Sequence, residues 1–178
     1  MIKIYFKHTL LLLSLICFFG CQSYKTGSLM HPQLKTVNIA QIKNTTDTPR
    51  LQGIIRQKLL ETFMFDGSLK LVDKKNADLF LFCNVEKYQI TGLGTTYRSD
   101  YKEDDDGDDY GTEVFALTVD LAYKVFLPGK EKPLLTGVVT GQSDFNMHGD
   151  LEISRQKAFK QACSDAASKI VSQITEAW

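Results

Sequence analysis

Two stretches of the chain place apolar residues at the three- and four-residue spacing of an amphipathic helix. We expect the first helix to begin with Thr48 as its cap and Pro49 in its first turn, where the missing N–H costs nothing. It should end at Asp66-Gly67. The second helix follows Gly149-Asp150 and runs to the end of the chain. The stripes consist of Leu51, Ile54, Ile55, Leu59 and Phe63, and of Phe159, Ala162, Cys163, Ala166, Ala167, Ile170, Val171 and Ile174.

Four other stretches have the composition or the alternation of β-strands. We predict strands at Thr36–Ile42, Leu79–Ile90, Val114–Leu127 and Leu134–Gln142. Ser68–Val72 is a short extended piece, and the two glycines of the last strand leave room for a bulge or a close backbone approach. The third strand alternates cleanly. Its predicted core face consists of Phe115, Leu117, Val119, Leu121, Tyr123 and Val125.

The element order is therefore β-α-β-β-β-α. It predicts an α+β fold in which two helices pack on one face of a four-stranded mixed sheet. The first strand-helix-strand unit should be a right-handed parallel crossover, and the last three strands an antiparallel meander. We expect one domain over residues 36–178.

The N-terminus has the organisation of an export signal. Lys3 and Lys7 precede an apolar run, Thr9–Phe19, which is much shorter than the ~20 residues needed to cross a bilayer. The run ends in Gly20-Cys21, which resembles a bacterial lipobox, although Phe18 stands where that motif usually has leucine. We therefore predict a lipoprotein signal peptide over 1–20 and a lipidated tether over 21–35. The alternative is an ordinary signal peptide.

Charge argues against two classes of partner. The whole chain has 21 basic and 21 acidic residues, and removal of residues 1–20 takes away two lysines. The chain lacks the basic excess that would indicate a nucleic-acid partner. It also lacks a polybasic segment that would indicate binding to an anionic membrane surface. Membrane attachment would then depend on lipid at Cys21 rather than on charge.

The strand at Leu79–Ile90 is apolar on both faces. Leu79 and Cys83 point one way, whereas Phe80 and Phe82 point the other. Exposed aromatic residues usually mark a contact surface, so Phe80 and Phe82 are candidates for a partner interface. The other interpretation is that the loop after Gly92, or helices packed in the opposite sense, cover them.

Two cysteines, Cys83 and Cys163, lie in predicted core positions. Disulfides form in exported proteins, and these two residues would meet if the helix covers that face of the strand. A bridge needs Cα atoms within about 7 Å, which the sequence does not reveal. The alternative is a pair of small buried thiols.

The sequence offers little for catalysis. The acidic residues between Asp104 and Glu113 have some of the spacing of a calcium loop, but Lys102 occupies the first ligand position and no helical pattern flanks them. His31 and His148 belong to no recognised catalytic motif. We expect a non-enzymatic protein with no metal site and no cofactor, and interpret 103–109 as a solvated loop.

Several short segments together resemble the LptE family, the lipopolysaccharide-assembly lipoproteins. They are Gly20–Gly27, Lys35–Ile39, Asn44, Ala77-Asp78-Leu79 and the C-terminal Trp178. The acidic insertion at 103–109 is not expected of the family.

The resemblance implies a lipid-anchored protein of the outer membrane that faces the periplasm. LptE-like proteins act as plug and assembly partner of the β-barrel translocon LptD, and they can contact lipopolysaccharide. A second hypothesis is a lipid-anchored periplasmic binding module for another envelope component, such as a glycan or a small lipid. It predicts a ligand-sized apolar pocket between the helices and the sheet, and no barrel partner.

Overall fold

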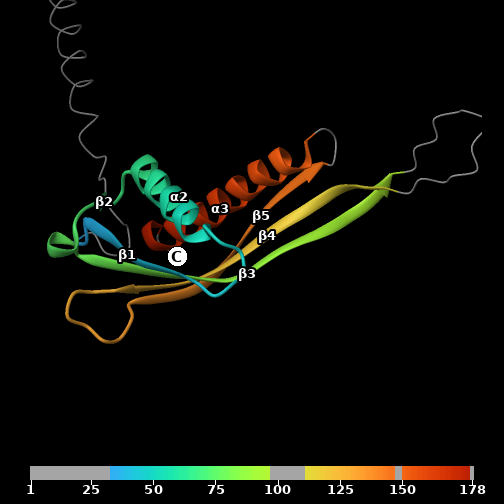
Figure 1. The fold of residues 1–178 in the computed structure, drawn as a ribbon. Helices are drawn as coiled ribbons and strands as arrows, with labels where there is room; N and C mark the ends of the chain where they lie inside the picture. The colour runs from blue at the N-terminus through green and yellow to red at the C-terminus, as the bar shows by residue number, and fades with distance from the viewer. Residues whose placement is uncertain (1–32, 97–110, 147–149, 177–178) are drawn as a thin grey trace, which may run out of the picture.

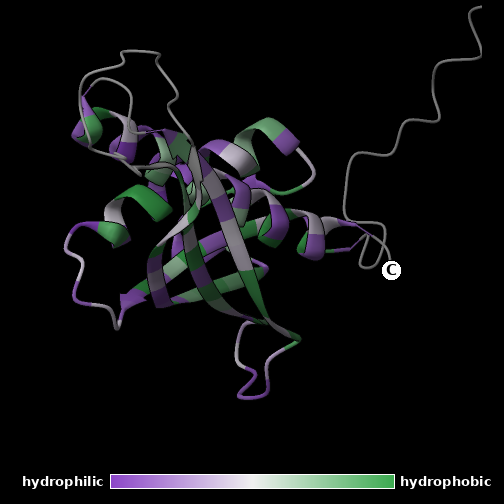
Figure 2. Ribbon diagram, turned by 90° about the vertical axis from the view of Figure 1, so that its right-hand side faces the viewer, coloured by the Kyte–Doolittle hydropathy of each residue, from purple (hydrophilic) through white to green (hydrophobic). Residues whose placement is uncertain are grey.

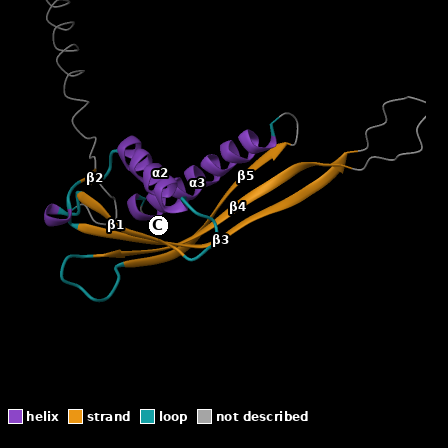
Figure 3. Ribbon diagram, in the orientation of Figure 1, coloured by secondary structure: helices purple, strands orange, loops and turns teal. Residues whose placement is uncertain are grey.

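The computed structural model describes residues 33–96, 111–146 and 150–176. Its strands and helices follow the expected order, with one extra strand and one short 3₁₀ helix (Figure 3). The elements are β1 (Thr36–Asn44), α2 (Leu51–Asp66), β2 (Lys70–Leu71), η1 (Lys74–Asn76), β3 (Leu79–Thr96), β4 (Gly111–Phe126), β5 (Leu135–Asn146) and α3 (Leu151–Thr175).

The sheet has five strands in the order β2-β1-β3-β4-β5. The prediction of four strands was wrong, because β2 pairs in parallel with the start of β1, Thr36 opposite Lys70. A two-residue strand carries no periodicity, so the sequence showed it only as an extended piece. The other pairings are as predicted: β1 is parallel to β3, and β3, β4 and β5 form an antiparallel meander.

Both helices lie on the same face of the sheet, which is strongly twisted and curls around them (Figures 1 and 2). The apolar stripe of α2 is buried as predicted apart from the half-buried Ile54, and that of α3 is buried apart from the half-buried Phe159. The odd-numbered residues of β4 from Leu117 to Val125 complete the core. Burial of each large side chain of this kind contributes about 1.5–3 kcal/mol.

The ends of the elements differ from expectation in two ways. Helix α2 begins at Leu51 after Arg50, whose φ of 66° is left-handed, so Thr48 is not its cap. The carbonyl of Thr48 instead accepts a hydrogen bond from Asn44 at 2.7 Å. The β3–β4 hairpin also runs farther, to Thr96, because backbone pairing continues where the apolar alternation stops.

The starts of β1 and β3 are joined by Asp78. Its carboxylate accepts hydrogen bonds from the backbone N–H groups of Lys35 and Thr36, both at 3.0 Å, and from the Thr36 hydroxyl at 2.8 Å. The Lys35 N–H contributes most to lowering the pKa of this carboxyl, followed by the Thr36 hydroxyl. The first described residues of the domain are thus fixed to the beginning of β3.

Candidate functional site: the outer face of the sheet

We call the face of the sheet opposite α2 and α3 the outer face. Strand register places Phe80 opposite Phe126 and Phe82 opposite Lys124 on this face. The rings of Phe82 and Phe126 meet edge to face, with centroids 5.4 Å apart. Within the described residues no helix packs on this face, so Phe82 stays 37% exposed and Val138, on β5, 62% exposed.

An open hollow of about 670 Å³ lies over these aromatic residues. Exposed lysines border it, Lys43 from β1 and Lys124 from β4, together with Glu86 from β3. Its floor contains the side-chain oxygen of Asn84, a buried acceptor that has no hydrogen-bond partner among the described residues. The hollow therefore combines an apolar floor, basic side chains and one unsatisfied acceptor, which suits binding better than catalysis.

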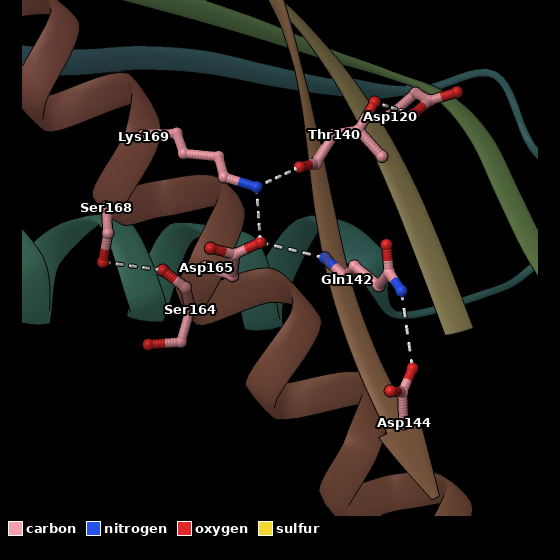
Figure 4. A network of polar contacts seen from close by, with 8 residues as sticks. All are labelled: Asp120, Thr140, Gln142, Asp144, Ser164, Asp165, Ser168 and Lys169. Carbon is pink, nitrogen blue, oxygen red and sulfur yellow. Dashed lines mark hydrogen bonds and ion pairs between the residues drawn. The ribbon is translucent and has the colours of Figure 1, made fainter. Parts of the chain in front are cut away.

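Farther along the strands the outer face becomes polar. The Thr140 hydroxyl donates to Asp120 at 2.6 Å across β5 and β4, and Gln142 and Asp144 follow on β5 (Figure 4). The apolar part of the outer face is thus confined to the end of the sheet near Phe80 and Phe126.

The edge of β5 is closed by side chains of α3. The carboxylate of Asp165 accepts a hydrogen bond from the backbone N–H of Gln142 at 3.0 Å, and Lys169 donates to the carbonyl of Thr140 at 2.7 Å (Figure 4). Lys169 and Asp165 also form an ion pair at 2.7 Å. These bonds occupy backbone groups that an added strand would need, so at this position the edge is protected from strand addition.

The two candidate interface residues lie where the alternation placed them. Phe80 is half-buried and Phe82 exposed, both on the outer face, so the interpretation that helices cover them is wrong. The loop proposed as a cover includes residues 97–110, which lie outside the described residues. Sequence reasoning missed Phe126 and Val138, although counting in steps of two along each predicted strand would have placed them on this face.

Other predicted positions lie outside the described residues. They are the lipidation site Cys21, the acidic segment 103–109, His31, His148 and Trp178. In the part of the chain that is described, no group of three or more His, Cys, Asp or Glu side chains could hold a metal ion. Over the same residues, no helix has the length and apolarity that crossing a membrane requires.

The structure does not bring Cys83 and Cys163 together. Cys83 pairs with Tyr123, whose hydroxyl donates to Gln173 on α3 at 2.5 Å. Cys163 precedes Gln173 by roughly ten residues of the same helix, or about 15 Å along its axis. Both are free, buried thiols, and burial raises the pKa of each from 9.0 to about 12.

This burial predicts a loss of stability in alkali. Above pH 9 the unfolded chain loses thiol protons that the folded protein keeps until about pH 12, so the thiols favour folding below pH 9 and cease to do so as the pH rises toward 12. Urea unfolding of the wild type between pH 8 and 11 should show a steeper decline than that of a Cys83→Ala/Cys163→Ala variant. Equal slopes, or a bridge detected under non-reducing conditions, would contradict this prediction.

Known proteins share both the family pattern and the fold. The family model described as "LptE: Lipopolysaccharide-assembly" matches residues 34–175. A Xanthomonas campestris protein of the DUF330 family aligns at 12% identity over 86% of this chain and 87% of its own, with a TM-score of 0.58.

Two further solved structures are lipoproteins. A minor lipoprotein from Acinetobacter baumannii aligns at 12% identity over 80% of this chain and 94% of its own, with a TM-score of 0.51. Lipoprotein B from Nitrosomonas europaea aligns at 12% identity over 88% and 90%, with a TM-score of 0.50. Comparison with curated proteins gives no match. At these identities the solved structures indicate a shared fold alone, whereas the family model spans most of the sequence: this chain belongs to the LptE family of lipopolysaccharide-assembly proteins.

Proposed function

We propose that this protein is a non-enzymatic lipoprotein that acts in lipopolysaccharide assembly as plug and assembly partner of an LptD-type β-barrel. Membership of the family supports a lipoprotein of lipopolysaccharide assembly. The barrel partnership, the outer-membrane location facing the periplasm and the acyl anchor at Cys21 belong to the proposal. It requires a surface on this small domain that a larger protein can cover.

The observation that carries the proposal is the composition of the outer face. Phe82 and Val138 expose much of their apolar surface, and Lys43 and Lys124 line the hollow that contains Phe82. Protein interfaces combine a few buried aromatic anchors with a polar rim. The interior of an outer-membrane barrel is polar, so the lysines and the polar half of the outer face suit contact with such a wall.

Substitution of Phe82 by aspartate should remove this contact. A buried, unpaired carboxylate is costly in an interface, and we expect at least a tenfold loss of barrel recovered with the protein after detergent extraction. Ile153→Asp is the matched control, since Ile153 is 51% exposed on α3, away from the outer face. Circular dichroism should show both variants folded. Undiminished recovery of the barrel with Phe82→Asp, or recovery of the wild type only as a free monomer after crosslinking, would refute the proposal.

The anchor has its own test. Labelled palmitate should enter the wild type, whereas Cys21→Ser should abolish labelling and leave no acylated protein in the membrane fraction. Stable anchoring is expected because several acyl chains bind a bilayer far better than one. Cys17→Ser, which changes the other cysteine of the N-terminal segment, should retain the label. Label that persists in Cys21→Ser would exclude that residue as the lipid site.

The hollow on the outer face favours a second candidate function, a lipid-anchored binding module for a glycan or a small lipid. It lies on the face away from the helices, and not between the helices and the sheet as the sequence-based hypothesis predicted. Its volume of about 670 Å³ lies in the range of small-molecule sites, and the free acceptor of Asn84 could receive a hydrogen bond from a ligand. Under this hypothesis the purified protein retains a small molecule in native mass spectrometry and no barrel. Lipopolysaccharide carries both acyl chains and phosphates, so native mass spectrometry would also detect lipopolysaccharide bound to the purified protein.

A further inference from the structure

One end of the domain collects segments that are far apart in the sequence. We call it the tether end: it comprises the start of β1, β2, η1, the turn 127–134 and the C-terminal end of α2 (Figure 1). The backbone N–H of Lys70 donates to the Lys35 carbonyl at 2.9 Å, and the Thr36 hydroxyl donates to the Asn76 carbonyl at 3.1 Å. The described chain also begins here, at Gln33.

The most exposed large apolar side chains of the described residues lie at this end. Phe65 is 95% exposed and Met64 76% exposed, in the last turn of α2. The helix stops directly after them, at Gly67 with a φ of 70°. Their neighbour Phe63 is fully buried, so the two residues that follow it project outward from the domain. Adjacent, almost fully exposed Met and Phe side chains mark a surface that something else covers.

Lysines lie toward the same end of the domain, and one of them, Lys130, also lines the hollow on the outer face. Six of them are exposed at the tether end, and none forms an ion pair with another described residue: Lys35, Lys70, Lys74, Lys75, Lys130 and Lys132. Four acidic residues, Asp66, Asp73, Asp78 and Glu131, share this end, so its lysines exceed its carboxylates by two. The lysines come from four separate segments of the chain. The fold therefore builds a basic surface where the sequence has no polybasic run.

We propose that the tether end docks on the membrane leaflet that holds the protein's own acyl anchor. Phe65 and Met64 enter the headgroup region, and the lysines contact anionic phospholipid headgroups. Exposed apolar side chains and lysines at one end of the domain are suited to this interface, where apolar burial and attraction to anionic lipid act together. The charges act only within about 8 Å at physiological salt, so their position at the tip matters.

The first described residue lies at the tether end, and this position favours the membrane leaflet as the surface that covers Phe65 and Met64. The inference rests on the proposed acyl group at Cys21, and the dozen residues from there to Gln33 can span at most about 40 Å. A tether of this length keeps the tether end at high effective concentration near the membrane surface. If the domain docks through this end of the sheet, the outer face does not contact the membrane surface and stays accessible to a barrel partner.

The test uses the acylated protein reconstituted into vesicles, with an environment-sensitive fluorophore on Met64→Cys. Native Cys83 and Cys163 are buried and should not react. In phosphatidylglycerol vesicles we expect a blue shift and quenching by spin-labelled lipid, and little of either in phosphatidylcholine. The same label on Val138→Cys, on the outer face, is the matched control and should stay in water. A Lys70→Gln/Lys74→Gln/Lys75→Gln variant should lower the ratio of docked to undocked protein by about a hundredfold, and Phe65→Ser should lower it as well.

The outcomes separate this inference from the proposed function. If the protein fails to float with vesicles, the anchor at Cys21 is refuted, and the inference falls with it. If the protein floats but the label at position 64 stays in water, or shifts equally at position 138, the docking inference is overturned while the anchor stands. Protection of position 64 only after a barrel protein is added would overturn it too, since the tip would then contact protein.

Discussion

Replacement of Phe63 by alanine is expected to lower the free energy of unfolding by about 3–5 kcal/mol. Phe63 is the largest fully buried side chain of the domain and lies in the last turns of α2, which packs against the sheet and α3. Alanine would leave a cavity that the surrounding helices and strands can fill only in part. Urea denaturation followed by far-ultraviolet circular dichroism measures the change.

Phe65→Ala supplies the control for this prediction. The two phenylalanines are two residues apart on the same helix, but Phe65 is 95% exposed. Its replacement should change the free energy of unfolding by no more than about 0.5 kcal/mol. Equal effects of the two substitutions would mean that α2 packs on the sheet through a different face from the one described.

Gly141→Ala is expected to destabilise the domain by about 1–3 kcal/mol although it adds one methyl group. A Cβ at this position of β5 would collide with the carbonyl oxygen of Ala162 and lie 2.7 Å from the Cβ of Ala166. Both obstacles belong to α3 and one is backbone, so the helix would have to move away from the strand. The bonds from Asp165 and Lys169 to the edge of β5 would lengthen with it. Thermal or urea unfolding measures the effect.

Gly53→Ala should have the opposite sign. Gly53 lies in the exposed side of α2, and a Cβ there would meet nothing within 4 Å. Alanine lowers the entropy of the unfolded chain and favours the helix, which gives a gain of about 0.5–1 kcal/mol. If Gly141→Ala proved neutral as well, the close approach of α3 to β5 would be refuted.

The two contact surfaces that we propose lie on different parts of the domain. The outer face offers aromatic residues and lysines along the broad side of the sheet, whereas the tether end offers Phe65 and lysines at its tip. The core and the α3–β5 contacts hold these surfaces in a fixed relation.

Local sequence patterns were sufficient to predict most of the helices and strands. The four-residue spacing of Leu51 to Phe63 and the Asp66-Gly67 stop each act within one or two turns of chain, so the sequence revealed both helices. At the start of α3 the Asp150 carboxylate likewise accepts hydrogen bonds from the backbone N–H groups of Glu152 and Ile153. Alternation revealed which side of β3 carries Phe80 and Phe82. These features are fixed by side-chain period and by capping chemistry, both of which are local.

The sequence by itself thus determined the helices, the main strands, the two faces of β3 and the family segments. Only the tertiary structure decided the fifth strand, the start of α2 at Leu51, the separation of Cys83 from Cys163 and the edge-to-face contact of Phe126 with Phe82. It also gathered lysines of four segments at one end. These features depend on register and on which segments the fold brings side by side, and such long-range contacts leave no period in the sequence.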